Sequence, residues 1–215
     1  MQHSYKEVIT AAIMVRQAYR FTDHHVNNVD FRHYDFEDEQ HLVFKGTSKN
    51  AGRSGSFALF WDIVSGLRFI PRTDDDYGLG RHPAGFLEAA ESFIEYILFK
   101  ETGIDPNKPL TLCGHSMGGA VLLIAAPVMA AHGMNVKSVI TFGSPNVGGL
   151  PDVPGLKVTC LKNGWDVVTS LPPFYKDSYK TIRIGEGKKG LIADHRLDSY
   201  IDSIKQLKDE WPTDL

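Results

Sequence analysis

Cysteine is scarce in this chain of 215 residues, which contains only Cys113 and Cys160. Both lie in apolar segments that we expect to be strands, so we expect two free, buried thiols, with a disulfide as the alternative. The sequence has no C-x-x-C pair and no Cys/His cluster that would indicate a structural metal. We therefore expect neither a metal centre nor another cofactor.

Excess charge and long apolar runs are also lacking. The formal net charge of -3 provides no bulk attraction for nucleic acid or for an anionic membrane. The longest apolar run, Ala120–Ala131, is too short to span a bilayer and predicts a buried helix. The first residues, MQHSYKEV, lack the basic and apolar segments of a secretory signal, so we expect a cytoplasmic protein that does not bind nucleic acid.

Helical and extended patterns alternate along the chain, whose length suits one domain with a single sizeable core. Ser4 and Glu7 have the spacing of a capping box and predict a helix over about 5–19. We expect further helices over about 83–100, 117–131 and 195–208, and strands over about 29–33, 41–45, 63–70, 109–113, 136–142, 156–161 and 180–184. This order predicts one α/β domain over residues 1–215, with a mostly parallel central sheet and helices on both faces.

Two polar clusters lie between these elements. His24 and His25 follow the first helix and are expected in a solvated loop, and the run Asp74–Asp76 is expected in a solvated turn. A metal ion at the histidines, or calcium at the aspartates, is the alternative that each cluster leaves open.

The most informative stretch is LTLCGHSMGGA at residues 110–120, which contains a G-x-S-x-G pentapeptide around Ser116. An apolar strand precedes the pentapeptide and small residues follow it, as in a nucleophile elbow, where a sharp turn joins a buried strand to a helix. Glycines suit such a turn because a side chain would collide with the strand or the helix. Ser116 would then lie at the carboxyl edge of the sheet, over a helix N-terminus that favours negative charge.

A serine nucleophile needs a base, and the base needs a carboxylate that orients it. His132 would lie about 24 Å down the helix from Ser116, at about 1.5 Å per residue, so it cannot be the base. His195 is the only other downstream histidine and is therefore the candidate base.

The candidate acids downstream of the serine are more numerous. They are Asp152, Asp166, Asp177, Asp194 and Asp198. We prefer Asp166 because it directly follows a predicted strand and should project at the same edge of the sheet as the serine. Asp194 is expected instead to cap the last helix.

The oxyanion that forms when a serine attacks a carbonyl needs backbone N–H donors. One donor is expected to be the N–H of Met117, directly after the nucleophile. The second is expected after an earlier strand, where Gly46-Thr47 is best placed, with a plain strand-ending turn as the alternative.

The wider set of motifs resembles the class 3 lipase family of α/β hydrolases, over about residues 5–205. The matching segments are LVFKGTS at 42–48, RHPAGF at 81–86, GHSMGGA at 114–120, TFGSPNVGG at 141–149, KNGWDVVTSLPP at 162–173 and DHRLDSY at 194–200. The pentapeptide alone is shared with many hydrolases, whereas the combination of segments is far more specific. The resemblance implies the α/β-hydrolase fold.

The resemblance also implies roles for individual residues. The family's nucleophile, acid and base correspond to Ser116, Asp166 and His195. Its oxyanion residue corresponds to Thr47, whose hydroxyl can add to its backbone N–H, and its aspartate behind that loop corresponds to Asp62.

Residues 49–61 have the composition of a lid, with a glycine-containing hinge followed by apolar side chains. Phe57, Phe60 and Trp61 are predicted to bind the acyl group or to contact a lipid surface, with packing in the core as the alternative.

Leu171 and Phe174 are predicted to line the substrate pocket beside His195, and core packing is again the alternative. His82 is expected to be structural and to hydrogen-bond the loop that supports the site.

Together these motifs predict a serine carboxylic-ester hydrolase, of lipase, phospholipase or small-ester type. It would act on acyl lipids through a Ser-His-Asp triad and an acyl-enzyme, with transient contact to a lipid interface. The alternatives are a catalytically silent lipid-binding module and an acyltransferase that uses the same residues.

Overall fold

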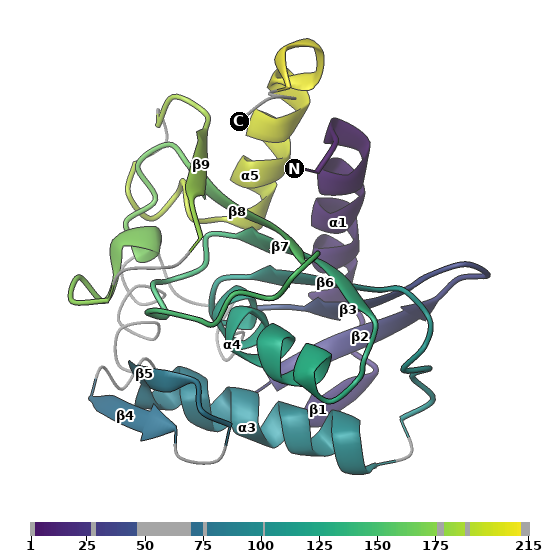
Figure 1. The fold of residues 1–215 in the computed structure, drawn as a ribbon. Helices are drawn as coiled ribbons and strands as arrows, with labels where there is room; N and C mark the ends of the chain where they lie inside the picture. The colour runs from purple at the N-terminus through teal and green to yellow at the C-terminus, as the bar shows by residue number, and fades with distance from the viewer. Residues whose placement is uncertain are drawn as a thin grey trace.

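Among the residues that this computed structural model describes, seven strands form one central sheet, in the order β1-β2-β3-β6-β7-β8-β9 (Figure 1). The structure describes residues 3–26, 29–46, 70–74, 77–100, 102–175, 179–187 and 190–211. The strands of the sheet are β1 (His24–Val26), β2 (Val29–Asp35), β3 (Gln40–Phe44), β6 (Leu110–His115), β7 (Val136–Phe142), β8 (Lys157–Asn163) and β9 (Thr181–Ile184). Strands β4 (Pro71–Asp74) and β5 (Gly80–Pro83) pair with each other in a separate ribbon. The helices are α1 (Tyr5–Ala18), α3 (Ala84–Phe99), α4 (Met117–Ala131) and α5 (Leu197–Gln206), with short 3-10 turns η1 (Val168–Ser170) and η2 (Lys208–Glu210).

The sheet is mostly parallel. Strands β1, β2 and β3 pair antiparallel, and every pairing from β3 through β9 is parallel. Helices α1 and α5 lie side by side on one face of the sheet, and α3 and α4 cover the other (Figure 1). The predicted α/β architecture is therefore confirmed. Within the described ranges, no helix is both long and apolar enough to cross a membrane.

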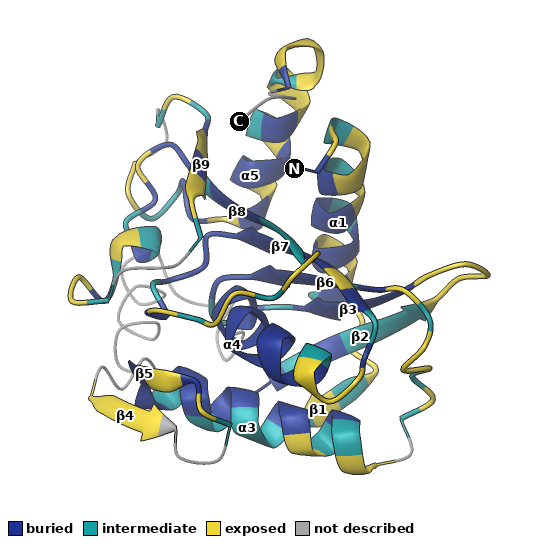
Figure 2. Ribbon diagram, viewed as in Figure 1, coloured by how far each residue is buried: buried dark blue, intermediate teal, exposed yellow. Residues whose placement is uncertain are grey.

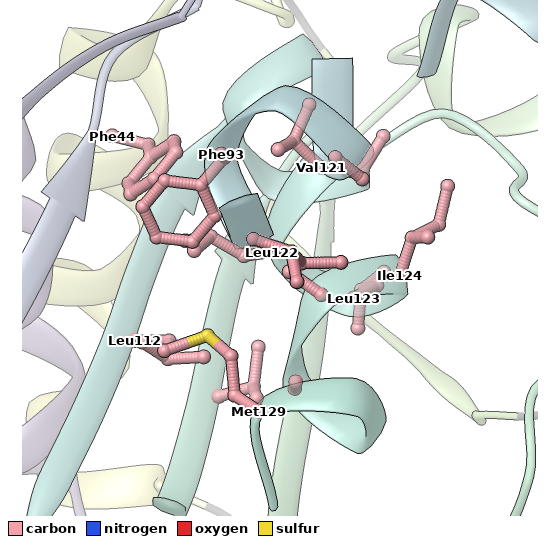
Figure 3. Packing of buried hydrophobic residues seen from close by; sticks show 14 of the residues in the cluster. Phe44, Phe93, Leu112, Val121, Leu122, Leu123, Ile124 and Met129 are labelled. Atoms are coloured by element: carbon pink, nitrogen blue, oxygen red, sulfur yellow. The ribbon is translucent and has the colours of Figure 1, made fainter. Parts of the chain in front are cut away.

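The sheet separates two apolar layers, because successive residues of a strand face opposite sides. One layer lies under α3 and α4, and α4 is buried at every position from Gly118 to Met129. In this layer, side chains of α4 pack beside Phe44, Phe93 and Leu112 (Figure 3). The other layer lies under α1 and α5, whose outer faces are exposed to solvent (Figure 2).

The two cysteines illustrate this division. Cys113 on β6 belongs to the layer of α1 and α5, and Cys160 on β8 belongs to the layer of α3 and α4. Both thiols are buried and free, as predicted from the sequence. Burial also raises the pKa of the Cys113 thiol, which keeps it protonated.

Helix α1 begins with the predicted capping box. The Ser4 hydroxyl accepts the N–H of Glu7 at 3.3 Å, and the Glu7 carboxylate accepts the N–H of Ser4 at 2.6 Å. These two bonds satisfy donors that would otherwise have no partner at a helix start.

One predicted loop is wrong, and a second is wrong at its first residue. His24 and His25 form β1 instead of a solvated loop, because β2 supplies backbone partners and the His24 ring stacks on Phe31 at 4.8 Å. Asp74 ends β4 and pairs with Gly80. The rest of that aspartate run, and the predicted strand over 63–69, lie outside the described residues.

The parallel pairings bring four strand ends to one edge of the sheet. Phe44 pairs with Gly114, His115 pairs with Phe142, and Phe142 pairs with Leu161. The residues that follow β3, β6, β7 and β8 therefore converge at this edge, and they include the predicted site residues.

Candidate active site

Ser116 occupies a strained turn between β6 and α4. Its φ is 54° and its ψ is -129°, and among the described residues it is the only one other than glycine with a positive φ. Its N–H donates to the Phe142 carbonyl at 2.9 Å, and its own carbonyl accepts the N–H of Gly119 at 3.0 Å. The side chain does not cap α4. The hydroxyl is thus available to a partner outside the helix, as the predicted elbow requires.

Two glycines of the pentapeptide allow this turn because their backbones touch other backbone atoms. A Cβ at Gly114 would lie 2.7 Å from the nitrogen of Gly119, and a Cβ at Gly118 would lie 2.6 Å from the carbonyl oxygen of Lys45. Neither backbone contact could yield to a side chain. Glycine at 114 therefore lets β6 pack against the start of α4, and glycine at 118 lets α4 pack against the backbone that follows β3.

Three side chains from separate segments meet at the edge of the sheet. His195 Nε2 lies 3.0 Å from Ser116 Oγ, and His195 Nδ1 lies 2.9 Å from Asp166 Oδ2. All three residues are at most 3% exposed. An ionised carboxylate only accepts, so Nδ1 carries a proton toward Asp166 and Nε2 accepts the hydroxyl proton of Ser116. Such a chain can draw the proton from Ser116 as its oxygen attacks a carbonyl carbon.

The other candidate acids and the other histidine lie elsewhere. His132 follows the last turn of α4, where its Nδ1 donates to the Val128 carbonyl at 2.9 Å. Asp152 is exposed, and Asp198 on α5 lies 3.9 Å from the Arg16 guanidinium. Asp177 lies outside the described residues.

Three donors converge on the Asp166 carboxylate. Oδ2 accepts the His195 Nδ1–H and the Tyr200 hydroxyl, the latter at 2.5 Å, and Oδ1 accepts the N–H of Val168 at 2.9 Å. Burial by itself favours the neutral acid, but the electrostatic attraction to His195 and these hydrogen bonds outweigh burial and lower the pKa of Asp166. The carboxylate is therefore ionised at neutral pH.

Tyr200 is a functional candidate that the sequence analysis missed. It is fully buried in α5, where burial and the charge of Asp166 raise the pKa of its phenol well above the usual value. It therefore remains a hydrogen-bond donor. Nothing in the local pattern of α5 signals a contact with a residue 34 positions earlier in the chain.

Asp194 does not cap the last helix as predicted. Helix α5 starts after Arg196 without a side-chain cap, and Asp194 Oδ2 instead accepts the N–H of Trp165 at 2.9 Å. Asn163 Nδ2 also donates to the Asp194 carbonyl at 3.0 Å. These bonds dock the turn that carries His195 onto the turn that carries the acid, and this long-range contact prevails over the local capping preference.

Gly46, at the end of the segment after β3, lies directly beside Ser116. A Cβ at Gly46 would lie 2.9 Å from the Ser116 Cβ and 2.7 Å from the Tyr19 hydroxyl oxygen. Thr47 lies outside the described residues, so its oxyanion role stays a prediction. Met117 is the first residue of α4 and half-buried, and its role as the other donor also stays a prediction.

Most of the predicted substrate-binding residues are not described. The candidate lid at 49–61, with Phe57, Phe60 and Trp61, lies outside the described ranges, and so does Asp62. Leu171 is half-buried, and its carbonyl accepts the N–H of Asn146 at 2.8 Å.

Two further predicted residues are placed clearly. The Phe174 side chain is 91% exposed, on the surface near the segment that carries Leu171. His82 is fully buried, and its Nδ1 donates to the Val147 carbonyl at 2.7 Å, which confirms its predicted bond to the loop after β7. In the described part of the chain, no three His, Cys, Asp or Glu side chains are grouped as metal ligands.

Comparison with known proteins identifies a family. The family described as Lipase (class 3) matches residues 41–176. Phospholipase A1-II 1 of Oryza sativa subsp. indica is 34% identical over 90 residues, which cover 37% of this chain and 23% of that protein. Phospholipase A1 EG1, chloroplastic/mitochondrial, of the same subspecies is 31% identical over 99 residues, which cover 42% and 21% respectively. The matches span less than a quarter of the length of these curated relatives.

Solved structures share the fold. The Lip2 lipase from Yarrowia lipolytica aligns with a TM-score of 0.59 and 16% identity, over 84% of this chain and 80% of that chain. The lipase from Rhizopus microsporus var. chinensis aligns with a TM-score of 0.60 and 16% identity, over 87% and 76%. At this identity the likeness concerns the arrangement of helices and strands, which is the α/β-hydrolase fold.

Proposed function

This chain belongs to the class 3 lipase family, and from that premise we propose that it hydrolyses carboxylic esters of acyl lipids. The observation that carries the proposal is the buried hydrogen-bonded chain from Ser116 through His195 to Asp166, with contacts of 3.0 and 2.9 Å. A silent lipid-binding module would need no such chain, so the geometry favours catalysis.

In the proposed reaction, Ser116 Oγ attacks the ester carbonyl carbon while His195 Nε2 takes the hydroxyl proton. Asp166 holds the imidazole with Nδ1–H toward itself and stabilises the imidazolium. The tetrahedral intermediate then collapses, and the imidazolium gives its proton to the departing alcohol. Water, activated by the same imidazole, hydrolyses the acyl-enzyme and restores Ser116.

The proposed oxyanion donors are the N–H groups of Met117 and Thr47, with the Thr47 hydroxyl as a third. Two observations support this side of the proposal: Met117 starts α4, and Gly46 lies against Ser116. An N–H at a helix start points along the helix dipole toward developing negative charge, which is where an oxyanion is stabilised.

The proposed substrates are acyl lipids, and the preferred class of lipid is to be found by comparing several classes. The curated relatives are named phospholipases A1, so a phospholipid belongs in the substrate panel beside triglycerides and soluble esters. The proposed binding residues Leu171 and Phe174, and the proposed lid at 49–61, would contact the acyl chain.

Ester turnover by purified protein tests the proposal. We expect hydrolysis of a soluble p-nitrophenyl ester, and a fall in kcat of more than about 10³-fold in Ser116→Ala. Ser144→Ala is the matched control, because Ser144 is another buried serine after a central strand and its hydroxyl donates to the Pro145 carbonyl at 3.1 Å. Equal activity of Ser116→Ala and wild type would contradict the proposal.

The same panel separates the alternatives. Phospholipid and triglyceride presented above and below their solubility limits would reveal the preferred lipid and any rate increase at the interface. Lipid binding without turnover of any ester would favour the silent module. Formation of a new ester when an acceptor alcohol is added, in preference to free acid, would favour the acyltransferase.

A further inference from the structure

Tyr19, which is half-buried, and His115, which is buried, form a hydrogen-bonded link between segments that surround Ser116. The N–H of Gly46 donates to the Tyr19 hydroxyl oxygen at 2.8 Å, and that oxygen lies 2.7 Å from His115 Nδ1. His115 Nε2 lies 2.8 Å from the backbone carbonyl oxygen of His195. The link therefore runs from the end of the β3 segment, across the end of α1 and the elbow, to the turn that carries the proposed base.

Only one arrangement of protons satisfies every atom of this link. The His195 carbonyl can only accept, so His115 Nε2 must carry a proton and donate it. His115 Nδ1 is then an acceptor, and the Tyr19 hydroxyl must donate to it. The Tyr19 oxygen remains free to accept the N–H of Gly46. A buried network with all donors and acceptors matched is rigid, because any displacement leaves a buried polar atom unpaired.

Both side chains are held neutral. Burial, with the nearby His195, lowers the pKa of His115 to about 3. Burial also raises the pKa of the Tyr19 phenol. The proton arrangement of the link is therefore the same at any pH near neutrality.

The neutrality of His115 matters because its ring packs against the proposed base. The centroids of the His115 and His195 rings are 4.8 Å apart, with 31° between the ring planes. A second positive charge at this distance would oppose the imidazolium that forms on His195 during ester attack. The Tyr19 donor favours the neutral ring, since it stabilises the lone pair on Nδ1.

We propose that Tyr19 and His115 are positioning residues that fix the spacing between Gly46 and His195 on either side of Ser116. This inference rests on the proposed ester hydrolysis and assigns no contact with substrate to either residue. They act through the backbone of Gly46, which precedes the proposed oxyanion donor Thr47, and through the backbone of His195.

The first test is Tyr19→Phe, which removes the acceptor of Gly46 and the donor to His115 together. A displacement of about 1 Å at a catalytic group costs about 10²-fold, so we expect kcat to fall about 10- to 100-fold with KM within about twofold of wild type. Tyr34→Phe is the matched control. It removes the 3.1 Å hydrogen bond from the Tyr34 hydroxyl to Gln17, which lies two residues before Tyr19, and it leaves the link intact. Its kcat should equal that of wild type.

Two replacements of His115 separate the halves of the link. In His115→Asn, the amide oxygen stands where Nδ1 was and can accept from Tyr19. In His115→Gln, the amide nitrogen stands where Nε2 was and can donate to the His195 carbonyl. We expect each variant to retain a higher kcat than His115→Ala, because each keeps one bond of the link.

Unfolding temperatures measured on every variant exclude a loss of folded protein. A kcat of Tyr19→Phe within twofold of wild type would overturn the inference. So would equal kcat values for His115→Asn, His115→Gln and His115→Ala.

The imidazole nitrogen spectrum of wild-type protein provides a readout that does not depend on turnover. We expect His115 to be neutral at pH 6, with its proton on Nε2, and a proton on Nδ1 would overturn the inference. Failure of the proposed function would appear differently, as wild-type protein that neither hydrolyses esters nor reacts with a fluorophosphonate. That result would contradict the positioning role as well, even if the imidazole spectrum showed the expected proton on Nε2.

Discussion

Asp166→Asn tests the proposed roles of the acid and the base together. The amide nitrogen of the new side chain must replace either Oδ1 or Oδ2. In place of Oδ1 it would face the N–H of Val168, a donor that cannot turn away. In place of Oδ2 it would face His195 Nδ1 and the Tyr200 hydroxyl, and both of these can change. The hydroxyl can rotate to accept, and the imidazole can move its proton to Nε2.

The relaxed variant therefore carries its imidazole proton on Nε2, which then donates toward Ser116 and cannot take its proton. Opposing the Val168 N–H instead costs about 1–3 kcal/mol, so the population of the reactive tautomer falls about 5- to 150-fold. Loss of the negative charge beside the imidazolium adds to this. We expect a total fall in kcat of about 10⁴-fold, the size of the effect of the same replacement in the Ser-His-Asp triad of a serine protease.

The assay is steady-state hydrolysis of a soluble p-nitrophenyl ester, with circular dichroism to show that the fold is retained. Asp198→Asn is the matched control, since the Asp198 side chain is 66% exposed on α5. A kcat for Asp166→Asn within tenfold of wild type would refute the tautomer argument.

Three further predictions concern the packing around the acid. Gly143→Ala should lower both stability and kcat, because φ is 63° and a Cβ would lie 2.8 Å from Asp166 Oδ2. The hydrogen bond from Tyr200 helps to lower the pKa of Asp166 in the folded protein. A carboxyl with a lowered pKa contributes its full stabilisation at pH values above its pKa in the unfolded chain, about 3.9. This stabilisation is lost as the pH falls through the pKa of the folded state. Tyr200→Phe should therefore lose about 1–3 kcal/mol of unfolding free energy at pH 7 and less at pH 3. Asp194→Ala should cost about 1 to 1.5 kcal/mol, because the partly buried N–H of Trp165 loses its hydrogen-bond acceptor.

Matched variants isolate each cause, and chemical denaturation with ester kinetics provides the readout. Gly155→Ala has a φ of 81° but nothing within 4 Å of its Cβ, so it should show only the backbone strain of about 1–2 kcal/mol. Tyr34→Phe should show a loss that is independent of pH over this range, since its partner Gln17 does not titrate. Asp198→Ala should cost less than about 1 kcal/mol. If a variant and its matched control lose the same unfolding free energy, with the same pH dependence for the tyrosine pair, the role assigned to that contact is contradicted.

The regular elements were largely predictable from the sequence, because their apolar periodicity is local. The predicted range 136–142 coincides with β7, and α1 starts at the predicted cap. Strand β1 was missed because the pair His24-His25 is polar, and only its pairing with β2 makes it extended. The register of the sheet, and hence the convergence of four strand ends, is also a property of the tertiary structure.

The site was predictable to the extent that few residues could fill each role. One downstream histidine was free to act as a base, and one aspartate followed a strand at the right edge. The contacts that hold these groups could not be predicted, because they join residues far apart in the chain. Tyr19 and His115 are separated by 96 positions, and Asp194 and Trp165 by 29.

The measurement that most directly tests the central claim is peptide mapping after reaction with a fluorophosphonate probe. The probe phosphonylates a serine, with loss of fluoride, only where a base removes the hydroxyl proton and donors stabilise the phosphoryl oxygen. We predict a single adduct on the peptide that contains Ser116, absent in Ser116→Ala and present in Ser144→Ala. An adduct on another serine, or no adduct on folded protein, would contradict the proposal that Ser116, His195 and Asp166 form the catalytic site.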